Sequence, residues 1–215
     1  MIKQSIVFAR HAVAAWALLS CAIAGSAHAQ SLSGSALVDA LRHGGYVLVM
    51  RHASSPPVPP DKSSADPGNV SLERQLDETG RRTARSMGDA IKQLHIPVGS
   101  VFSSPAYRAQ ETVRLASLGT PKASVELNAP QGMAPANGHT SQATWLRKAV
   151  RQSPMAGSNT FLVTHAPNIM AAFPESAAGL ADGETLIFRP DGRGSAFLVA
   201  RVKIEEWPQL AAQKP

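Results

Sequence analysis

Short apolar strands alternate with helical segments along most of this chain, and the alternation limits the folds that it can adopt. Residues 46–50 form an apolar run rich in β-forming residues, and residues 160–164 form a second one. Between them, apolar residues recur at helical spacing in the segments 77–94 and 107–118. Strands separated by such helices are typical of a mainly parallel sheet that is covered by helices. The sequence therefore predicts an α/β fold.

The remaining expected elements are further helices, short strands and a hairpin, with a proline-rich loop after the first strand. The loop 54–69 is rich in proline, so it can be neither a helix nor a central strand. Gly44 and Gly45 end a helix in the usual way. The remaining predicted elements are helices at 35–42 and 140–151, short strands at 101–102 and 125–127, and a hairpin of strands 185–189 and 196–202.

The first 29 residues have the pattern of a secretory signal peptide. A basic start is followed by the apolar run 12–24, and an A-x-A cleavage pattern ends at Ala29. The apolar run is shorter than the roughly 20 residues that a membrane-spanning helix needs. We therefore expect a signal peptide over residues 1–29, one folded domain over residues 30–215, a periplasmic or secreted location, and no membrane association after cleavage. A retained N-terminal anchor is the alternative.

Composition excludes several classes of site. Cys21 is the only cysteine and lies in the expected signal peptide, where its setting loosely resembles a lipobox, so lipidation is an alternative to removal. Without it the domain has no disulfide, no cysteine nucleophile and no cysteine-ligated zinc. The 21 basic residues exceed the 15 acidic ones modestly, which favours anionic small molecules. No basic cluster is present and aromatic residues are few, so we expect no nucleic-acid partner.

Two histidines stand directly after the two buried strands. His52 follows the first strand through Arg51, and His165 follows the strand 160–164. The chemistry of such sheets lies just beyond the carboxyl ends of the strands, so both side chains are expected at one edge. A neutral imidazole nitrogen can attack phosphorus, and an adjacent guanidinium can hold a phosphate through paired hydrogen bonds. The same Arg-His-Ala triplet occurs at residues 10–12, so the preceding strand, not the triplet, carries the prediction.

Arg108 is the third candidate, in the segment Ser104-Pro105-x-x-Arg108. Pro105 suits a first helical turn, and we expect Arg108 on the first turn of the helix that follows. The helix dipole and the free N–H groups of that turn attract anions, and a guanidinium adds to this attraction. The spacing alone leaves open the alternative that Arg108 is a solvated surface residue.

Taken together and in order, four segments resemble the motifs of the histidine phosphatase superfamily, whose fold is phosphoglycerate mutase-like. The segments are Val49-Met50-Arg51-His52-Ala53, Leu76-Asp77-Glu78-Thr79-Gly80-Arg81, Ser104-Pro105-x-x-Arg108-x-x-Glu111-Thr112 and Val163-Thr164-His165. The resemblance spans residues 46–201 and implies a three-layer α/β/α sandwich with a mainly parallel central sheet.

The resemblance also implies a role for each matching residue. His52 would attack phosphorus and become a phosphohistidine, which water then hydrolyses. Arg51, Arg108 and His165 would surround the phosphoryl oxygens, and Ser55 stands where many members have a hydroxyl that touches the phosphate. Phosphoryl transfer needs mainly positioning and charge stabilisation, so no metal or other cofactor is expected.

The sequence departs from the family pattern at the proton donor. Ala129 stands where many members have a glutamate that acts as the general acid, and Ala166 follows His165 where another branch has an acid. Glu184 is the first substitute and Glu126 the second. An ordinary loop carboxylate is the alternative for Glu184.

These features and the resemblance predict a periplasmic phosphoric monoester hydrolase. Its substrate would be a small phosphorylated compound, such as an envelope metabolite or a sugar phosphate. The absent acid motivates an alternative, a catalytically weak or inactive phosphate-binding module of the same fold. A metallohydrolase is disfavoured because the chain has no paired ligand motif such as H-E-x-x-H.

Overall fold

The computed structural model describes residues 31–129 and 140–213, so the expected signal peptide lies outside the described residues. The strands are β1 (Val47–Arg51), β2 (Val98–Ser103), β3 (Lys122–Ala123), β4 (Asn159–Thr164), β5 (Thr185–Pro190) and β6 (Ala196–Val202). The helices are α1 (Gly34–His43), α2 (Glu78–Gln93), α3 (Tyr107–Leu115), α4 (Ser141–Ala149), α5 (Ala166–Ala172) and α6 (Glu206–Ala212), and a 3-10 turn, η1, covers Val125–Leu127.

The strands form one six-stranded sheet in the order β3-β2-β4-β1-β5-β6. The pairings β3–β2, β2–β4 and β4–β1 are parallel, whereas β5 runs antiparallel to β1 and β6 antiparallel to β5. In this register Arg51 lies opposite Thr164, and Ser103 lies opposite Val163. The carboxyl ends of β2, β4 and β1 therefore meet at one edge of the sheet, together with the start of β5.

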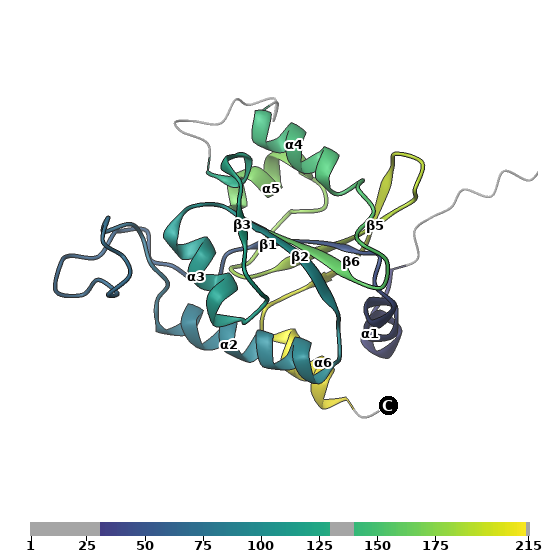
Figure 1. Ribbon diagram of the computed structural model, residues 1–215, viewed down its shortest axis with the longest axis horizontal. Coiled ribbons are helices and arrows are strands. Elements are labelled where there is room, and N and C mark those ends of the chain that lie inside the picture. Colours follow the sequence, from purple (N-terminus) through teal and green to yellow (C-terminus); the bar gives the residue numbers. More distant parts are fainter. Residues whose placement is uncertain (1–30, 130–139, 214–215) are drawn as a thin grey trace, which may run out of the picture.

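Helices cover both faces of the sheet (Figure 1). Leu48 and Met50 point into the core shared with α1, α2, α3 and α6, whereas Val47 and Val49 pack in the core shared with α4 and α5. All four are at most 1% exposed. Strands buried on both faces read as continuous apolar runs, which explains the sequence of β1. The predicted three-layer α/β fold with a mainly parallel sheet is confirmed.

Local signals set several boundaries as predicted. The Asp77 carboxylate accepts a 2.7 Å hydrogen bond from the Gly80 amide and caps α2, and the Thr140 hydroxyl caps α4 in the same way. Gly44 ends α1 with a φ of 76°, where a Cβ would collide with the backbone of Ser158. These local features fix the starts of α2 and α4 and the end of α1.

The predicted strand at 125–127 is wrong, because that segment is the turn η1. The amides of Leu127 and Asn128 donate to the carbonyls three residues earlier, and Leu127 is buried while Val125 is 69% exposed. The edge strand here is β3, slightly earlier in the chain. The helix predicted over 107–118 ends at Leu115, since Ser117 adopts a φ of 51°. The short helices α5 and α6 were not predicted.

None of the helices within residues 31–129 and 140–213 has the length and apolar character that a bilayer crossing requires.

Candidate active site

His52 and His165 lie together at the shared carboxyl edge of β1 and β4. Their ring centroids are 5.2 Å apart and the ring planes are inclined by 67°. His52 is 4% exposed and His165 2% exposed. The backbone joins the two strand ends as well, because the His52 amide donates to the Thr164 carbonyl at 3.0 Å. The structure thus places the two histidines as the order of strands and helices predicted.

The guanidinium of Arg108 bridges the two histidines. Its Nε donates to His52 Nε2 at 3.1 Å, and its Nη2 donates to His165 Nδ1 at 3.0 Å. Arg108 lies in the first turn of α3, as predicted, although Pro105 precedes the helix and does not lie in it. The side chain is partly buried and not solvated on the surface.

The hydrogen bonds determine which nitrogen of each imidazole carries the proton. His52 Nδ1 is 2.8 Å from the Ala53 carbonyl, which can only accept, so Nδ1 is protonated and Nε2 carries a lone pair. Arg108 only donates, so His165 Nδ1 carries a lone pair and its Nε2–H donates to Ser104 Oγ at 2.9 Å. Both lone pairs therefore converge on one guanidinium.

Both histidines are held in the neutral form. Burial is the main cause that lowers the pKa of His52 from 6.5 to about 4; the charges of Arg108 and Arg51 act in the same direction, against the hydrogen bond to Ala53. Burial and then the charge of Arg108 lower the pKa of His165 to about 2. At neutral pH the Nε2 of His52 is therefore unprotonated.

Arg51 is held by the loop that precedes β5. Its Nη2 pairs with the Asp182 carboxylate at 2.5 Å, and its Nη1 donates to the Leu180 carbonyl at 3.1 Å. Its Nε is buried and has no hydrogen-bond partner among the described residues. Within this part of the chain the Nε–H of the guanidinium is thus unpaired, while Asp182 offsets part of the charge.

Ser55 belongs to the loop after His52, and its hydroxyl donates to the Gln75 carbonyl at 2.8 Å. Its predicted contact with phosphate stays a prediction. The start of α2 packs directly on this loop, because a Cβ at Gly80 would collide with the backbone of Ser54.

Arg74 is a cation of the site that sequence reasoning missed. Its Nη2 donates to the Ser55 carbonyl at 3.1 Å, and its Nε donates to the Pro56 carbonyl at 2.7 Å. Its charge contributes to the lowered pKa of both histidines and of Arg108. In the sequence, Arg74 stands just before Asp77, the cap of α2, and this position does not indicate a role in the site.

Ser104 was also missed as a partner of the second histidine. Besides accepting from His165, its Oγ accepts from the Ala106 amide at 3.2 Å and donates to Asn128 Oδ1 at 2.8 Å. Asn128 is itself held, since its carbonyl accepts from the Asn168 amide group at 2.7 Å. Ser104 is completely buried, so the orientation of His165 is determined by fixed neighbours.

Neither candidate proton donor has suitable surroundings. Glu184 is buried, its Oε1 pairs with Arg201 at 2.7 Å, and its Oε2 accepts from the Ala181 amide at 2.8 Å. Burial raises the pKa of this carboxyl group, but the bonds to Arg201 and Ala181 outweigh it and the pKa is lowered. A hydrogen bond from Ser124 likewise lowers the pKa of Glu126. Both carboxyl groups are therefore held ionised.

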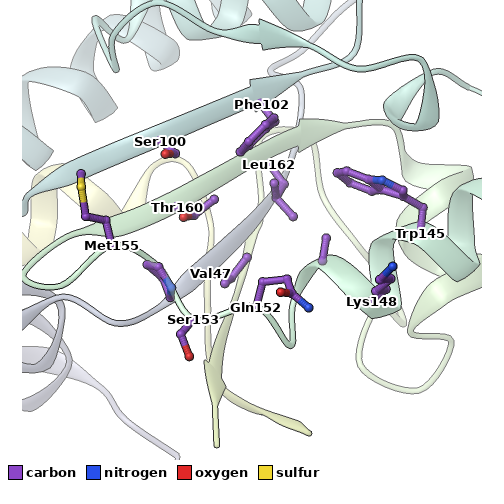
Figure 2. A pocket seen from close by; sticks show the side chains of 12 residues that line it. Val47, Ser100, Phe102, Trp145, Lys148, Gln152, Ser153, Met155, Thr160 and Leu162 are labelled. Carbon is purple, nitrogen blue, oxygen red and sulfur yellow. The ribbon is translucent and has the colours of Figure 1, made fainter. Parts of the chain in front are cut away.

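A separate hollow of about 350 Å³ lies between α4 and the sheet (Figure 2). Trp145, Phe102 and Met155 are among its lining residues, with Lys148 at the helix. None of the candidate site residues lines it, so it is distinct from the histidine edge.

The groups at the histidine edge suit an anion. Three guanidinium groups and two imidazoles surround it, and such groups bind phosphate or carboxylate oxygens through charge-assisted hydrogen bonds. Within the described parts of the chain, no group of three or more His, Cys, Asp or Glu side chains is placed to hold a metal ion.

Comparison with known proteins agrees with the motifs. Residues 47–132 match the family model described as the histidine phosphatase superfamily (branch 1). The fold is similar to that of the protein histidine phosphatase SixA complexed with tungstate, at 17% identity and a TM-score of 0.52, over 75% of this chain and 98% of that one. It is also similar to a phosphoserine phosphatase mutant from Entamoeba histolytica in complex with phosphoserine, at 13% identity and a TM-score of 0.51, over 74% of this chain and 98% of that one. No curated protein matches. At these identities the two structures show a shared fold.

Proposed function

We propose that this protein is a phosphatase, because residues 47–132 match the family model of the histidine phosphatase superfamily. It hydrolyses a phosphate ester, or a related phospho-compound, through a phosphohistidine intermediate on His52. The observation that carries the proposal is the convergence of three groups at one sheet edge: the lone pairs of His52 and His165 both meet the guanidinium of Arg108.

The surroundings of His52 suit a nucleophile. Its low pKa keeps Nε2 unprotonated, and the bond from Nδ1 to the Ala53 carbonyl fixes the ring. When Nε2 bonds to phosphorus the ring becomes an imidazolium, and the same carbonyl stabilises that charge. One contact thereby orients the nucleophile and supports the intermediate.

Arg108 supplies most of the charge for the transferred group. Its donors contact the two histidines at 3.1 and 3.0 Å, so a phosphoryl group between the rings takes over these donors and leaves Nε2 of His52 free to attack. The charges of Arg51 and Arg74 act on both histidines as well, and they add to the positive potential of the site. Phosphoryl transfer depends on such positioning and charge stabilisation.

Hydrolysis of p-nitrophenyl phosphate by the purified protein tests the proposal. We expect turnover by the natural sequence and none above background by His52→Ala, because the attacking atom is gone. His43→Gln is the matched control, since His43 is an exposed histidine at the end of α1, and it should leave the rate unchanged. Full activity in His52→Ala would place the nucleophile elsewhere.

The alternative is a catalytically weak or inactive module that binds phosphate. It is favoured by one observation: Glu184 and Glu126 are both held ionised and do not fit the role of general acid. Titration of the protein with inorganic phosphate, combined with the hydrolysis assay, distinguishes the two functions. A binding module binds phosphate saturably and turns over no phosphorylated compound.

The place of action and the substrate are part of the proposal. The basic start, apolar run and A-x-A pattern of the first 29 residues support export to the periplasm or the medium. A small phosphorylated envelope metabolite or sugar phosphate is the expected substrate. Cell fractionation followed by N-terminal sequencing tests the location, and a mature chain that starts at Gln30 is the predicted result. A lipidated chain that starts at Cys21 would instead support the lipoprotein alternative.

A further inference from the structure

We propose that His165 delivers the proton to the leaving group, in place of the missing carboxylic acid. The inference rests on the proposed phosphatase function and assigns the chemical role of one residue in it. Three observations carry it: the lone pair on Nδ1 of His165, the bond that fixes its other nitrogen to Ser104, and the ionised state of Glu184.

The lone pair of His165 determines how a phosphoryl group can be held there. Nδ1 of His165 and Nε2 of His52 both accept from the guanidinium of Arg108, so the two lone pairs lie beside the same group. A phosphoryl oxygen and an imidazole lone pair are both acceptors, and they attract each other only when a proton lies between them. A phosphate monoester bound as its monoanion brings that proton, and Nδ1 shares it.

Ser104 determines which nitrogen of the His165 ring carries the proton. Its Oγ already accepts from the Ala106 amide and donates to Asn128, so the remaining lone pair can only accept the Nε2–H of His165. The ring therefore keeps its proton on Nε2 and its lone pair on Nδ1. Ser104 acts as a positioning residue.

The first step balances without any further group. The phosphate ester monoanion carries one proton, which His165 Nδ1 takes and passes to the leaving oxygen as the P–O bond to that oxygen breaks. The lone pair of His52 Nε2 forms the new P–N bond, and the alcohol leaves neutral. In the second step Nδ1 accepts a proton from the attacking water as the P–N bond breaks. It then returns that proton to a phosphate oxygen, so the phosphate leaves as the monoanion and both histidines are neutral again.

Two substrates of similar shape test the role of His165. The leaving group of p-nitrophenyl phosphate departs readily without a proton, whereas the more basic phenolate of phenyl phosphate depends more strongly on one. General acid catalysis contributes about 10²- to 10⁴-fold, so His165→Gln should lower kcat/KM for phenyl phosphate at least about tenfold more than for p-nitrophenyl phosphate. Arg108→Lys is the control, since charge stabilisation serves both substrates and both should fall by similar factors.

Ser104 provides a second set of variants in case His165→Gln does not fold. Ser104→Ala frees the ring and should show the same selective loss on phenyl phosphate, while Ser104→Thr keeps the hydroxyl and should preserve the ratio of the two substrates. Equal losses on both substrates, in His165→Gln or in Ser104→Ala, overturn the inference while the phosphatase function stands. A natural protein that hydrolyses neither substrate overturns the function and the inference together.

Discussion

The Nε of Arg108 donates a hydrogen bond of 3.1 Å to the Nε2 of His52, the atom that we propose attacks phosphorus. The arginine thus occupies the lone pair of the nucleophile and lowers the pKa of its ring. An anion that accepts the hydrogen bonds of the Arg108 guanidinium thereby frees the lone pair of His52 Nε2. In the proposed mechanism, substrate binding and activation of His52 are therefore one event.

Arg108→Ala should lower the rate of p-nitrophenyl phosphate hydrolysis by about 10²- to 10³-fold, because charge on the phosphoryl oxygens loses its main donor. The same change should raise the pKa of His52, since a nearby positive charge is removed. Steady-state kinetics and NMR titration of the ring measure the two effects. Arg114→Ala is the matched control on the same helix, because Arg114 is 68% exposed and pairs with Glu111; a comparable loss there would contradict the assignment.

Stability should rise with pH in the window between about 4 and 6.5 because of His52. Its pKa is lowered in the folded protein, so the unfolded chain takes up a proton first as the pH falls below 6.5. Stability is therefore lost as the pH falls toward 4, and above 6.5 this histidine has no effect. Urea unfolding at several pH values measures the trend. His52→Asn should make it shallower, and an unchanged slope would show that His52 is not held neutral.

Glu184→Gln should affect stability and not chemistry. The carboxylate is buried and paired with Arg201 and the Ala181 amide, so its loss should cost about 1–3 kcal/mol in the free energy of unfolding. Denaturant unfolding measures that cost, and kcat at a temperature where the variant is folded should change little. A fall of about 10²-fold in kcat with normal stability would instead identify Glu184 as the general acid.

Gly80→Ala should impair the site from a distance. The added methyl group would collide with the backbone of Ser54, in the loop that follows His52. Overpacking of this kind costs about 1–3 kcal/mol, and the shifted loop should also lower kcat/KM. Ser86→Ala, an exposed change on the same helix, is the control for the kinetic and unfolding measurements. Unchanged activity in Gly80→Ala would show that the loop tolerates the shift.

The parts of the fold that could be predicted from the sequence are those with strong local patterns. The β1 strand reads as a continuous apolar run because both of its faces are buried, and Asp77 marks the start of α2 as a cap. The placement of His52 and His165 followed from their positions after two buried strands of an expected parallel sheet. By contrast, α5 and α6 have seven residues each, which is too short for a helical periodicity to stand out.

The rest of the site depends on contacts between distant parts of the chain. Ser104 and His165 are 61 residues apart in the sequence, and Arg108 and His52 are 56 apart. Glu184 precedes β5 and Arg201 lies in β6, and the pairing of these two strands brings them together. The sequence around Glu184 therefore does not indicate its partner. Arg74 joins the site through carbonyls of a proline-rich loop, and no motif indicates such a contact.

Trapping the covalent intermediate tests the central claim most directly. The protein is mixed with labelled p-nitrophenyl phosphate, quenched in alkali within the first turnovers, digested, and analysed by mass spectrometry for phosphate on histidine. We predict alkali-stable, acid-labile phosphate on His52 of the natural protein and none in His52→Ala. Turnover without any phosphate on His52, or with the label on another residue, would contradict the account.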